Sequence, residues 1–125
     1  VGGHMTHEKF LESEGGYITN MAPFSIYSIA AEMGVTNFVV PGNKPEYVRT
    51  YRQHLKQVGV DMEKLQLFAP GFVTQGGDIS ETGSVAGERW HAIVGGDICS
   101  KPTKEAMRES ALRLVSQIMN PTQEV

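Results

Sequence analysis

The sequence lacks the features of a disulfide-stapled, zinc-bound or nucleic-acid-binding protein. Its 125 residues include one cysteine, Cys99, which excludes a disulfide framework and a cysteine-rich zinc site. Lys and Arg number 11 against 14 Asp and Glu, so there is no basic surface for a nucleic-acid backbone. No stretch of about 18 apolar residues suggests a membrane helix, and residues 1–8 lack the features of a signal peptide. We expect a cytoplasmic protein with a small ligand.

Three short apolar segments are present, and each ends at a proline or a glycine. They cover residues 37–40, 65–69 and 91–94, so their starts are 28 and 26 residues apart. That distance fits one strand, a loop, a helix and a second loop, and it is too long for the strands of a sandwich. The spacing predicts parallel strands with helical crossovers, and no linker divides residues 1–125 into two domains.

The segment after the first apolar run predicts the clearest helix. We expect Asn43 to cap it, Glu46 to complete a capping box and Gly59 to end it. Apolar residues recur along this segment with helical spacing, as expected for a face that packs on a sheet. These residues are Val48, Tyr51, Leu55 and Val58.

The remaining segments predict less regular structure. Helices are expected over about 23–33 and about 103–119, and residues 70–90 suggest a loop with one short helix. The expected apolar face of the last helix comprises Met107, Ala111, Leu114, Val115 and Ile118. The first five residues fit either the end of a further strand or an expression tag. We favour the strand, because of the resemblance described below.

Two glycine-rich loops follow predicted strands, where ligands bind in parallel α/β proteins. In the loop at 70–78, glycines such as Gly76 allow backbone N–H groups to approach an anion, and Gln75 adds an amide that donates and accepts. Gly95 and Gly96 end the next strand, at a common place for a phosphate. The alternatives are an ordinary surface turn and close helix packing.

Other reactive side chains favour structural interpretations. His4, His7 and Glu8 do not have the spacing of a known metal motif, and no metal or cofactor is predicted. Cys99 is expected to be a packed thiol, and His54 a solvated residue of its helix.

The loop sequence Ala-Pro-Gly-Phe-Val-Thr-Gln-Gly-Gly-Asp at 69–78 resembles a family motif. It is similar to the S-P-G-x-x-x-Q-G-G-D loop after the seventh strand of orotidine 5'-monophosphate decarboxylase, a TIM-barrel family that makes UMP. Four other segments resemble the family in the same order: 4–7 its E-M-S-H, 34–41 its G-V-x-N-Y-V-x-P, 44–46 its R-P-E, and 93–95 its I-V-G. The resemblance covers about residues 1–119.

The resemblance implies an α/β fold of the TIM-barrel type, here about the second half of the barrel with four parallel strands. It implies a lyase of pyrimidine biosynthesis that removes CO2 from orotidine monophosphate (OMP) without a cofactor. Thr6 would bind the pyrimidine edge, and Gln75 would reach from its loop to the phosphate and the pyrimidine. Gly76, Gly95 and Gly96 would offer the loop backbone to the phosphate.

Two departures from the family pattern limit this expectation. Gly96 stands where the family has a phosphate-clamping Arg, and Arg89 is too far along the strand to replace it. The family's D-x-K-x-x-D motif, which carries the catalytic Lys and Asp array, belongs to the first half of the barrel and is absent. The chain is therefore expected to carry no catalytic residue and to be inactive alone.

A half barrel has open edges, so we expect it to pair with the missing N-terminal half, with itself or with a neighbouring chain. The family's sites also form across a homodimer. The alternative is a non-catalytic half-barrel that binds a phosphate ligand or assembles.

Overall fold

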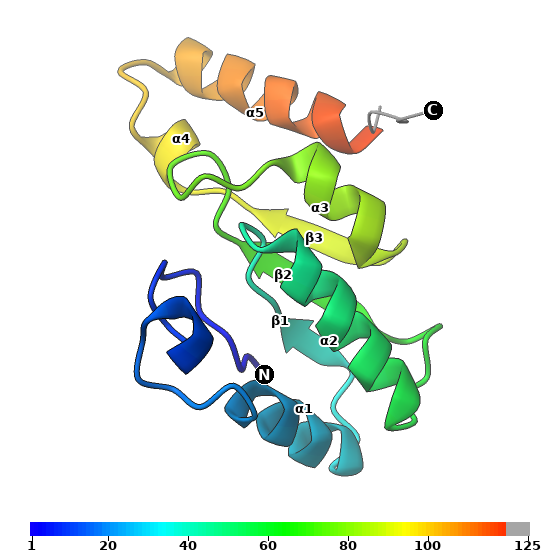
Figure 1. Ribbon diagram of the computed structural model, residues 1–125. Helices are drawn as coiled ribbons and strands as arrows, with labels where there is room; N and C mark the ends of the chain where they lie inside the picture. The colour runs from blue at the N-terminus through cyan, green and yellow to red at the C-terminus, as the bar shows by residue number, and fades with distance from the viewer. Residues whose placement is uncertain (120–125) are drawn as a thin grey trace.

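The short apolar segments form the parallel sheet that their spacing predicts. In the computed structural model, which describes residues 1–119, β1 (Asn37–Val39), β2 (Gln66–Pro70) and β3 (Trp90–Ile93) are parallel and lie in that order (Figure 1). The first residues add a fourth position, because Gly2 bridges in parallel to Val39. The Val39 N–H also donates to the Val1 carbonyl at 2.7 Å. The N-terminal segment thus lies in the sheet as a strand end would.

The crossovers are helices, as the spacing predicts. Consecutive long helices pack on one another in chain order, from α1 to α5 (Figure 1). The structure adds two short elements that the sequence reading did not anticipate, a 3-10 turn η1 and a helix α4. The elements are η1 (Glu12–Glu14), α1 (Ala22–Glu32), α2 (Pro45–Gln57), α3 (Ile79–Ala86), α4 (Gly96–Cys99) and α5 (Lys104–Met119).

The two faces of the sheet differ in burial. Phe38 and Leu67 are fully buried and belong to the same core as residues of the helices, including Tyr51 and Leu55 of α2. The residues that alternate with them are only half-buried or exposed. This open face of the sheet comprises Asn37, Val39, Gln66, Phe68, His91 and Ile93. The fold therefore matches a half barrel, with helices on the outer face and the inner face uncovered.

The start of α2 corrects one prediction. The N-cap residue is Lys44, and no side chain caps the helix. Asn43 lies one residue earlier and directs its amide to the Thr6 carbonyl instead, so it forms no capping box with Glu46. Competition from a tertiary hydrogen-bond acceptor explains the difference.

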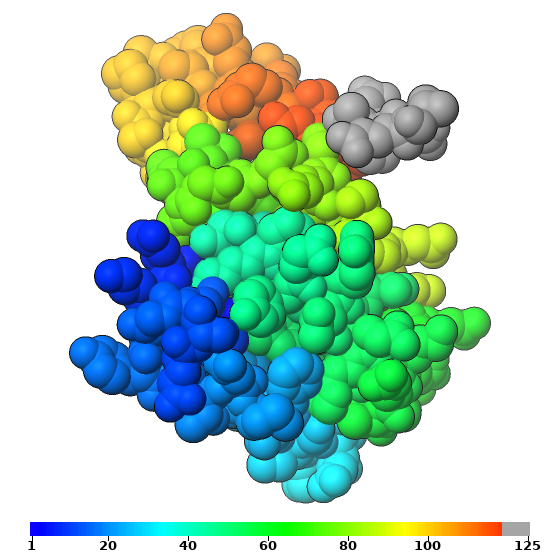
Figure 2. Space-filling model, viewed as in Figure 1, coloured from blue at the N-terminus to red at the C-terminus, as the bar shows by residue number. Residues whose placement is uncertain are grey.

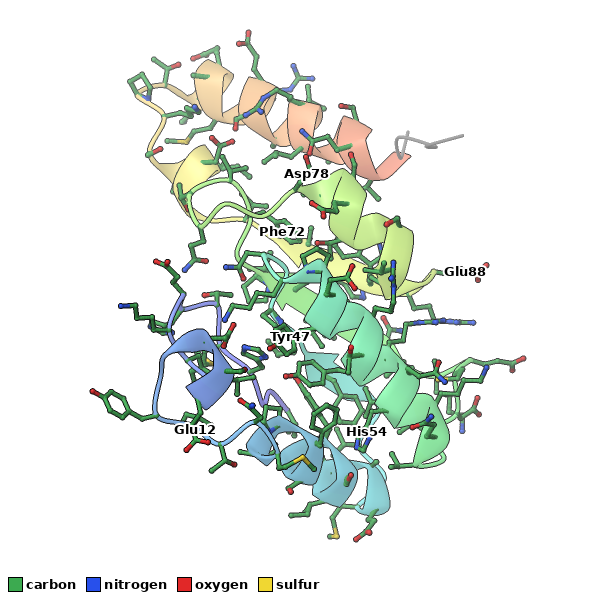
Figure 3. All side chains as sticks on the ribbon, viewed as in Figure 1. Glu12, Tyr47, His54, Phe72, Asp78 and Glu88 are labelled. Atoms are coloured by element: carbon green, nitrogen blue, oxygen red, sulfur yellow. The ribbon has the colours of Figure 1, made fainter. Side chains whose placement is uncertain are left out.

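Three side chains are placed differently from the prediction. Cys99 is exposed rather than packed. His54 is half-buried, its Nε2 lies 2.8 Å from the Ser28 hydroxyl and its ring packs edge-on against Phe24 (Figure 3). Val58, at the end of α2, is 41% exposed. Each departure lies at an element end, where periodicity says least about packing.

The inward face of α5 is narrower than predicted. Leu114 is buried, with Met107 and Ala111 half-buried, but Val115 and Ile118 are 50% and 42% exposed. Within residues 1–119, the main neighbours of this helix are α3 and α4. The outer half of the expected apolar face is therefore left uncovered.

Candidate functional site

The loop after β2 closes on itself through backbone hydrogen bonds. The Gly77 N–H donates to the Gly71 carbonyl, the Val73 N–H donates to the Gly77 carbonyl, and both bonds are 3.0 Å long. The Gly76 N–H donates to the Val73 carbonyl, also at 3.0 Å. Gly71 and Gly76 have φ of +106° and +87°, which explains why glycines stand there. Exposed Gln75 is left near the tip of a tight turn.

Val73 has φ +63°, a left-handed conformation that is strained for a β-branched residue. Its side chain is 40% exposed, so core packing does not compensate this strain. Strain of this kind concentrates at ligand-binding loops.

Thr6 lies directly beside this loop. A Cβ added to Gly71 would lie 2.9 Å from Thr6 Cγ2 and 2.9 Å from Asn43 Oδ1. Asn43 Nδ2 donates to the Thr6 carbonyl at 2.9 Å and, at 3.4 Å, to the Gln75 carbonyl. The structure thus brings the Thr6 loop and the Gln75 loop together at one point.

The glycine pair after β3 lies under the same loop. A Cβ added to Gly96 would lie 3.0 Å from Thr74 Cγ2, so the loop tip packs closely on Gly96. Gly95 and Gly96 are exposed, and no acceptor for their N–H groups is found among residues 1–119. In Figure 1 the loop after residue 4, the loop at 71–77 and α4 lie on the same side of the molecule.

An acidic residue follows this glycine pair. Asp97 accepts hydrogen bonds from the Ser110 hydroxyl at 2.7 Å and from Arg113 at 2.8 Å, and its Oδ1 lies 3.7 Å from Lys101 Nζ. The Ser110 bond, together with both cations, lowers the pKa of Asp97 despite partial burial. Two of the four cations that follow Gly96 along the chain, Lys101 and Arg113, are therefore paired with Asp97. Arg89, at the other end of β3, donates to the Met62 carbonyl.

A buried polar cluster supports the loop that carries Thr6. His4 is 2% exposed, its Nε2 lies 2.8 Å from Glu14 Oε1, and its Nδ1 lies 2.6 Å from the Tyr51 hydroxyl. Lys44 pairs with the other Glu14 oxygen at 2.8 Å. Because a carboxylate can only accept, His4 carries its proton on Nε2 and accepts from Tyr51 through Nδ1. Figure 3 shows Tyr47 of α2 directed toward this cluster.

The charges in this cluster follow from burial. Burial lowers the pKa of His4, and Lys44 acts in the same direction, whereas Glu14 opposes both. Burial alone would raise the pKa of Glu14, but hydrogen bonds from Lys44, the Leu11 N–H and His4 outweigh it and lower that pKa. Burial also raises the pKa of Tyr51, which keeps its hydroxyl as a donor. The cluster therefore contains neutral His4 and an ion pair of Lys44 with Glu14.

The binding residues expected from the sequence lie in these adjacent loops and at the start of α4; they are Thr6, Gln75, Gly76, Gly95 and Gly96. The Gly76 N–H is already bonded within its loop, whereas those of Gly95 and Gly96 are open. The sequence reading missed what joins the loops, namely Asn43, Lys44 and Glu14. The resemblance of 44–46 to the family's R-P-E was the available signal for Lys44, and Asn43 was expected only as a helix cap.

Two negative findings complete the site. Among residues 1–119, no group of three His, Cys, Asp or Glu side chains is arranged to hold a metal ion. The same part of the chain has no helix long and apolar enough to cross a membrane.

A shallow depression between α1 and α2, which includes Phe24 and His54, lies on the helical layer and away from the loops.

Comparison with solved structures shows which barrel this half resembles. Orotidine 5'-monophosphate decarboxylase from Sulfolobus solfataricus superposes with a TM-score of 0.65 at 25% identity, over 94% of this chain and 49% of that chain. The enzyme from Methanocaldococcus jannaschii, complexed with the inhibitor BMP, gives 0.64 at 21% identity, over 89% of this chain and 47% of that chain.

The sequence comparisons are negative, since neither a family model nor a curated protein matches at a significant level. The chain spans about half the length of the solved structures it matches. In motif order and in fold, the chain resembles about half of an orotidine 5'-monophosphate decarboxylase barrel.

Proposed function

We propose that this chain is the phosphate- and pyrimidine-binding half of an orotidine 5'-phosphate decarboxylase, the lyase that converts OMP to UMP and CO2. The observation that carries the proposal is that Thr6 and Gly96 both lie against the loop at 71–77, Thr6 beside Gly71 and Gly96 beside Thr74. These are the positions that the family motifs assign to the ligand. Like other enzymes of this class, it would need no cofactor.

Each group has a role that its chemistry allows. The Thr6 hydroxyl would bond the pyrimidine edge, and the Gln75 amide would span the pyrimidine and the phosphate. The open N–H groups of Gly95 and Gly96 would hold phosphate oxygens. Binding energy at the phosphate would then help to stabilise the transition state at the pyrimidine. Catalytic Lys and Asp would come from an N-terminal half-barrel, supplied by further sequence or by a second chain.

A second candidate is a half-barrel that binds a phosphate ligand without catalysis. Its support is that Gly96 stands where the family motif has an arginine, and that the nearby cations Lys101 and Arg113 are paired with Asp97. A charge-assisted bidentate contact is thereby lost, and phosphate binding should be weaker.

Titration of the ¹⁵N-labelled chain with UMP tests the binding proposal. We expect shifts of the amide signals of Thr6, Gln75 and Gly96, and Gln75→Ala should weaken binding about tenfold, because a hydrogen bond to a charged group is lost. Gln53→Ala, an exposed glutamine of α2, is the matched control. Absence of shifts at all three residues with UMP would contradict the ligand assignment.

Complementation separates the two candidates. The first half of the Sulfolobus solfataricus enzyme is added to the chain, and CO2 release from OMP is followed, with wild type and with Gly96→Arg. If the chain is half of a decarboxylase, the mixture should release CO2 from OMP, and Gly96→Arg should increase the rate of release. UMP binding without CO2 release in either mixture would favour the non-catalytic candidate.

A further inference from the structure

Two adjacent residues hold three successive carbonyl groups of the loop that carries Thr6. Asn43 Nδ2 donates to the Thr6 carbonyl at 2.9 Å. Lys44 Nζ donates to the carbonyls on either side, to Met5 at 3.1 Å and to His7 at 2.6 Å. This short loop has no regular structure of its own. Its position is therefore determined by side chains from the start of α2.

Lys44 is itself fixed in place. Its side chain is 11% exposed, and it pairs with Glu14 at 2.8 Å. Glu14 in turn accepts from the Leu11 N–H at 2.9 Å and from His4 at 2.8 Å. Because the ammonium group and the carbon chain of Lys44 are both already held in place, the side chain loses little further conformational entropy when it binds the carbonyls. It therefore fixes their positions.

Asn43 joins this loop to the loop at 71–77. The same Nδ2 lies 3.4 Å from the Gln75 carbonyl, and Oδ1 is buried without a partner among residues 1–119. Turning the amide over would place an oxygen against the carbonyls of Thr6 and Gln75, so its orientation is determined by these two acceptors. An unpartnered buried oxygen costs stability, so the two hydrogen bonds from Nδ2 are accompanied by an energetic cost at Oδ1.

We propose that Asn43 and Lys44 are positioning residues that set the Thr6 side chain and the Gln75 loop at a fixed separation for one nucleotide. The proposal rests on the proposed function, because it presumes that Thr6 and Gln75 contact the ligand. Neither residue touches the ligand itself. The distance between the pyrimidine contact and the phosphate contact is then determined by the first residues of α2 and not by either loop.

The first experiment measures loop order without any ligand. Order parameters of backbone amides are compared in wild type, Asn43→Ala and Lys44→Met. We expect the amides of Thr6 and Gln75 to become flexible in Asn43→Ala, and Thr6 alone in Lys44→Met. Lys44→Arg should restore order, and Asn37→Ala, on β1, is the control. Unchanged order in both loops of Asn43→Ala would overturn the proposal, whether or not UMP binds.

The second experiment is a double-mutant cycle on UMP affinity with Asn43→Ala and Thr6→Val. If Asn43 acts through Thr6, Asn43→Ala should weaken UMP binding about tenfold in wild type and much less in the Thr6→Val chain. A purely structural role would give the same factor in both, and that result would overturn the proposal. Wild type that fails to bind UMP would contradict the proposed function, and the order measurement then decides the positioning role by itself.

Discussion

His4 is a buried histidine that the fold keeps neutral. The Tyr51 hydroxyl and the Glu14 carboxylate face its ring nitrogens, Lys44 Nζ lies 3.1 Å from Nε2, and Tyr47 packs edge-on at 4.6 Å. A proton on the second nitrogen would force the Tyr51 hydroxyl to accept instead of donate, and it would bring a second cation next to Lys44. The loop that carries Thr6 begins directly after this residue.

This arrangement predicts a loss of stability in mild acid. The pKa of folded His4 lies below the ordinary 6.5, so the unfolded chain binds more protons as pH falls through 6.5. The contribution of His4 to the free energy of unfolding is complete above pH 6.5, and it is lost as the pH falls toward the pKa of His4 in the folded protein. Each unit by which the pKa is lowered corresponds to about 1.4 kcal/mol.

Urea unfolding at pH 7.5 and pH 5.5 measures this effect. Between pH 7.5 and pH 5.5, the free energy of unfolding should fall less in His4→Gln than in wild type. In His7→Gln, which replaces an exposed histidine, it should fall as much as in wild type. Glu14, with its lowered pKa, loses its contribution only at still lower pH. An equal fall in wild type and in His4→Gln would contradict the prediction.

At the scale of elements, α3 is tied to the loop before α2 by one buried hydrogen bond. Thr82 is fully buried, and its hydroxyl donates to the Gly42 carbonyl at 2.6 Å. Periodicity indicated only a short helix here and gave no sign of this bond. The contact holds the two helices that flank the 71–77 loop at a set distance.

Removing this hydroxyl tests the connection. Thr82→Val has nearly the same shape but leaves the Gly42 carbonyl without a partner, so we expect a loss of about 1–3 kcal/mol in the free energy of unfolding. Thr50→Val is the matched control, because exposed Thr50 bonds only within its own helix, to the Glu46 carbonyl. The control should change stability by less than about 0.5 kcal/mol. A loss in the control as large as that in Thr82→Val would show that the buried bond is not the cause.

At the scale of the whole molecule, both terminal helices carry exposed apolar side chains. The open face of the sheet is mixed, because Val39, Phe68 and Ile93 share it with three polar side chains. The exposed helix residues follow helical spacing: Ile26 and Ile29 on α1 with Met33 at its C-cap, and Leu112, Val115 and Ile118 on α5. Figure 2 shows α5 at one extremity of the molecule, beyond α3. Exposed apolar surfaces of this kind mark interfaces.

We therefore expect the chain to associate when nothing covers these surfaces. Light scattering of the purified chain should give a mass above that of one chain. Ile29→Lys with Val115→Lys should shift it toward the monomer and change the free energy of unfolding by less than about 0.5 kcal/mol, since both positions are exposed. Gln53→Lys controls for the added charge. A wild-type chain that stays monomeric at high concentration would contradict this prediction.

Much of the fold could be predicted because each strand is a short apolar run with its own stop signal. The segments 37–40, 65–69 and 91–94 each became a strand, with shifted ends, and the helix expected between 43 and 59 is α2. The predictions were wrong where a tertiary hydrogen-bond partner competed with a local one, as for Asn43, or where the side chain has no neighbouring element within residues 1–119 to cover it, as for Val115. Local sequence patterns carry no information about tertiary partners or about neighbouring elements.

The sequence by itself determined the parallel order of the strands, the helical crossovers and the positions of the two glycine-rich loops, because these depend on spacing, periodicity and backbone freedom. Only the tertiary structure decided that Thr6 and Gly96 both lie against the loop at 71–77, that Asn43 and Lys44 bind the carbonyls of residues 5–7, and that His4 is buried. These residues are far apart along the chain. Their contacts depend on how α2 packs against the N-terminal segment, and no local pattern encodes that packing.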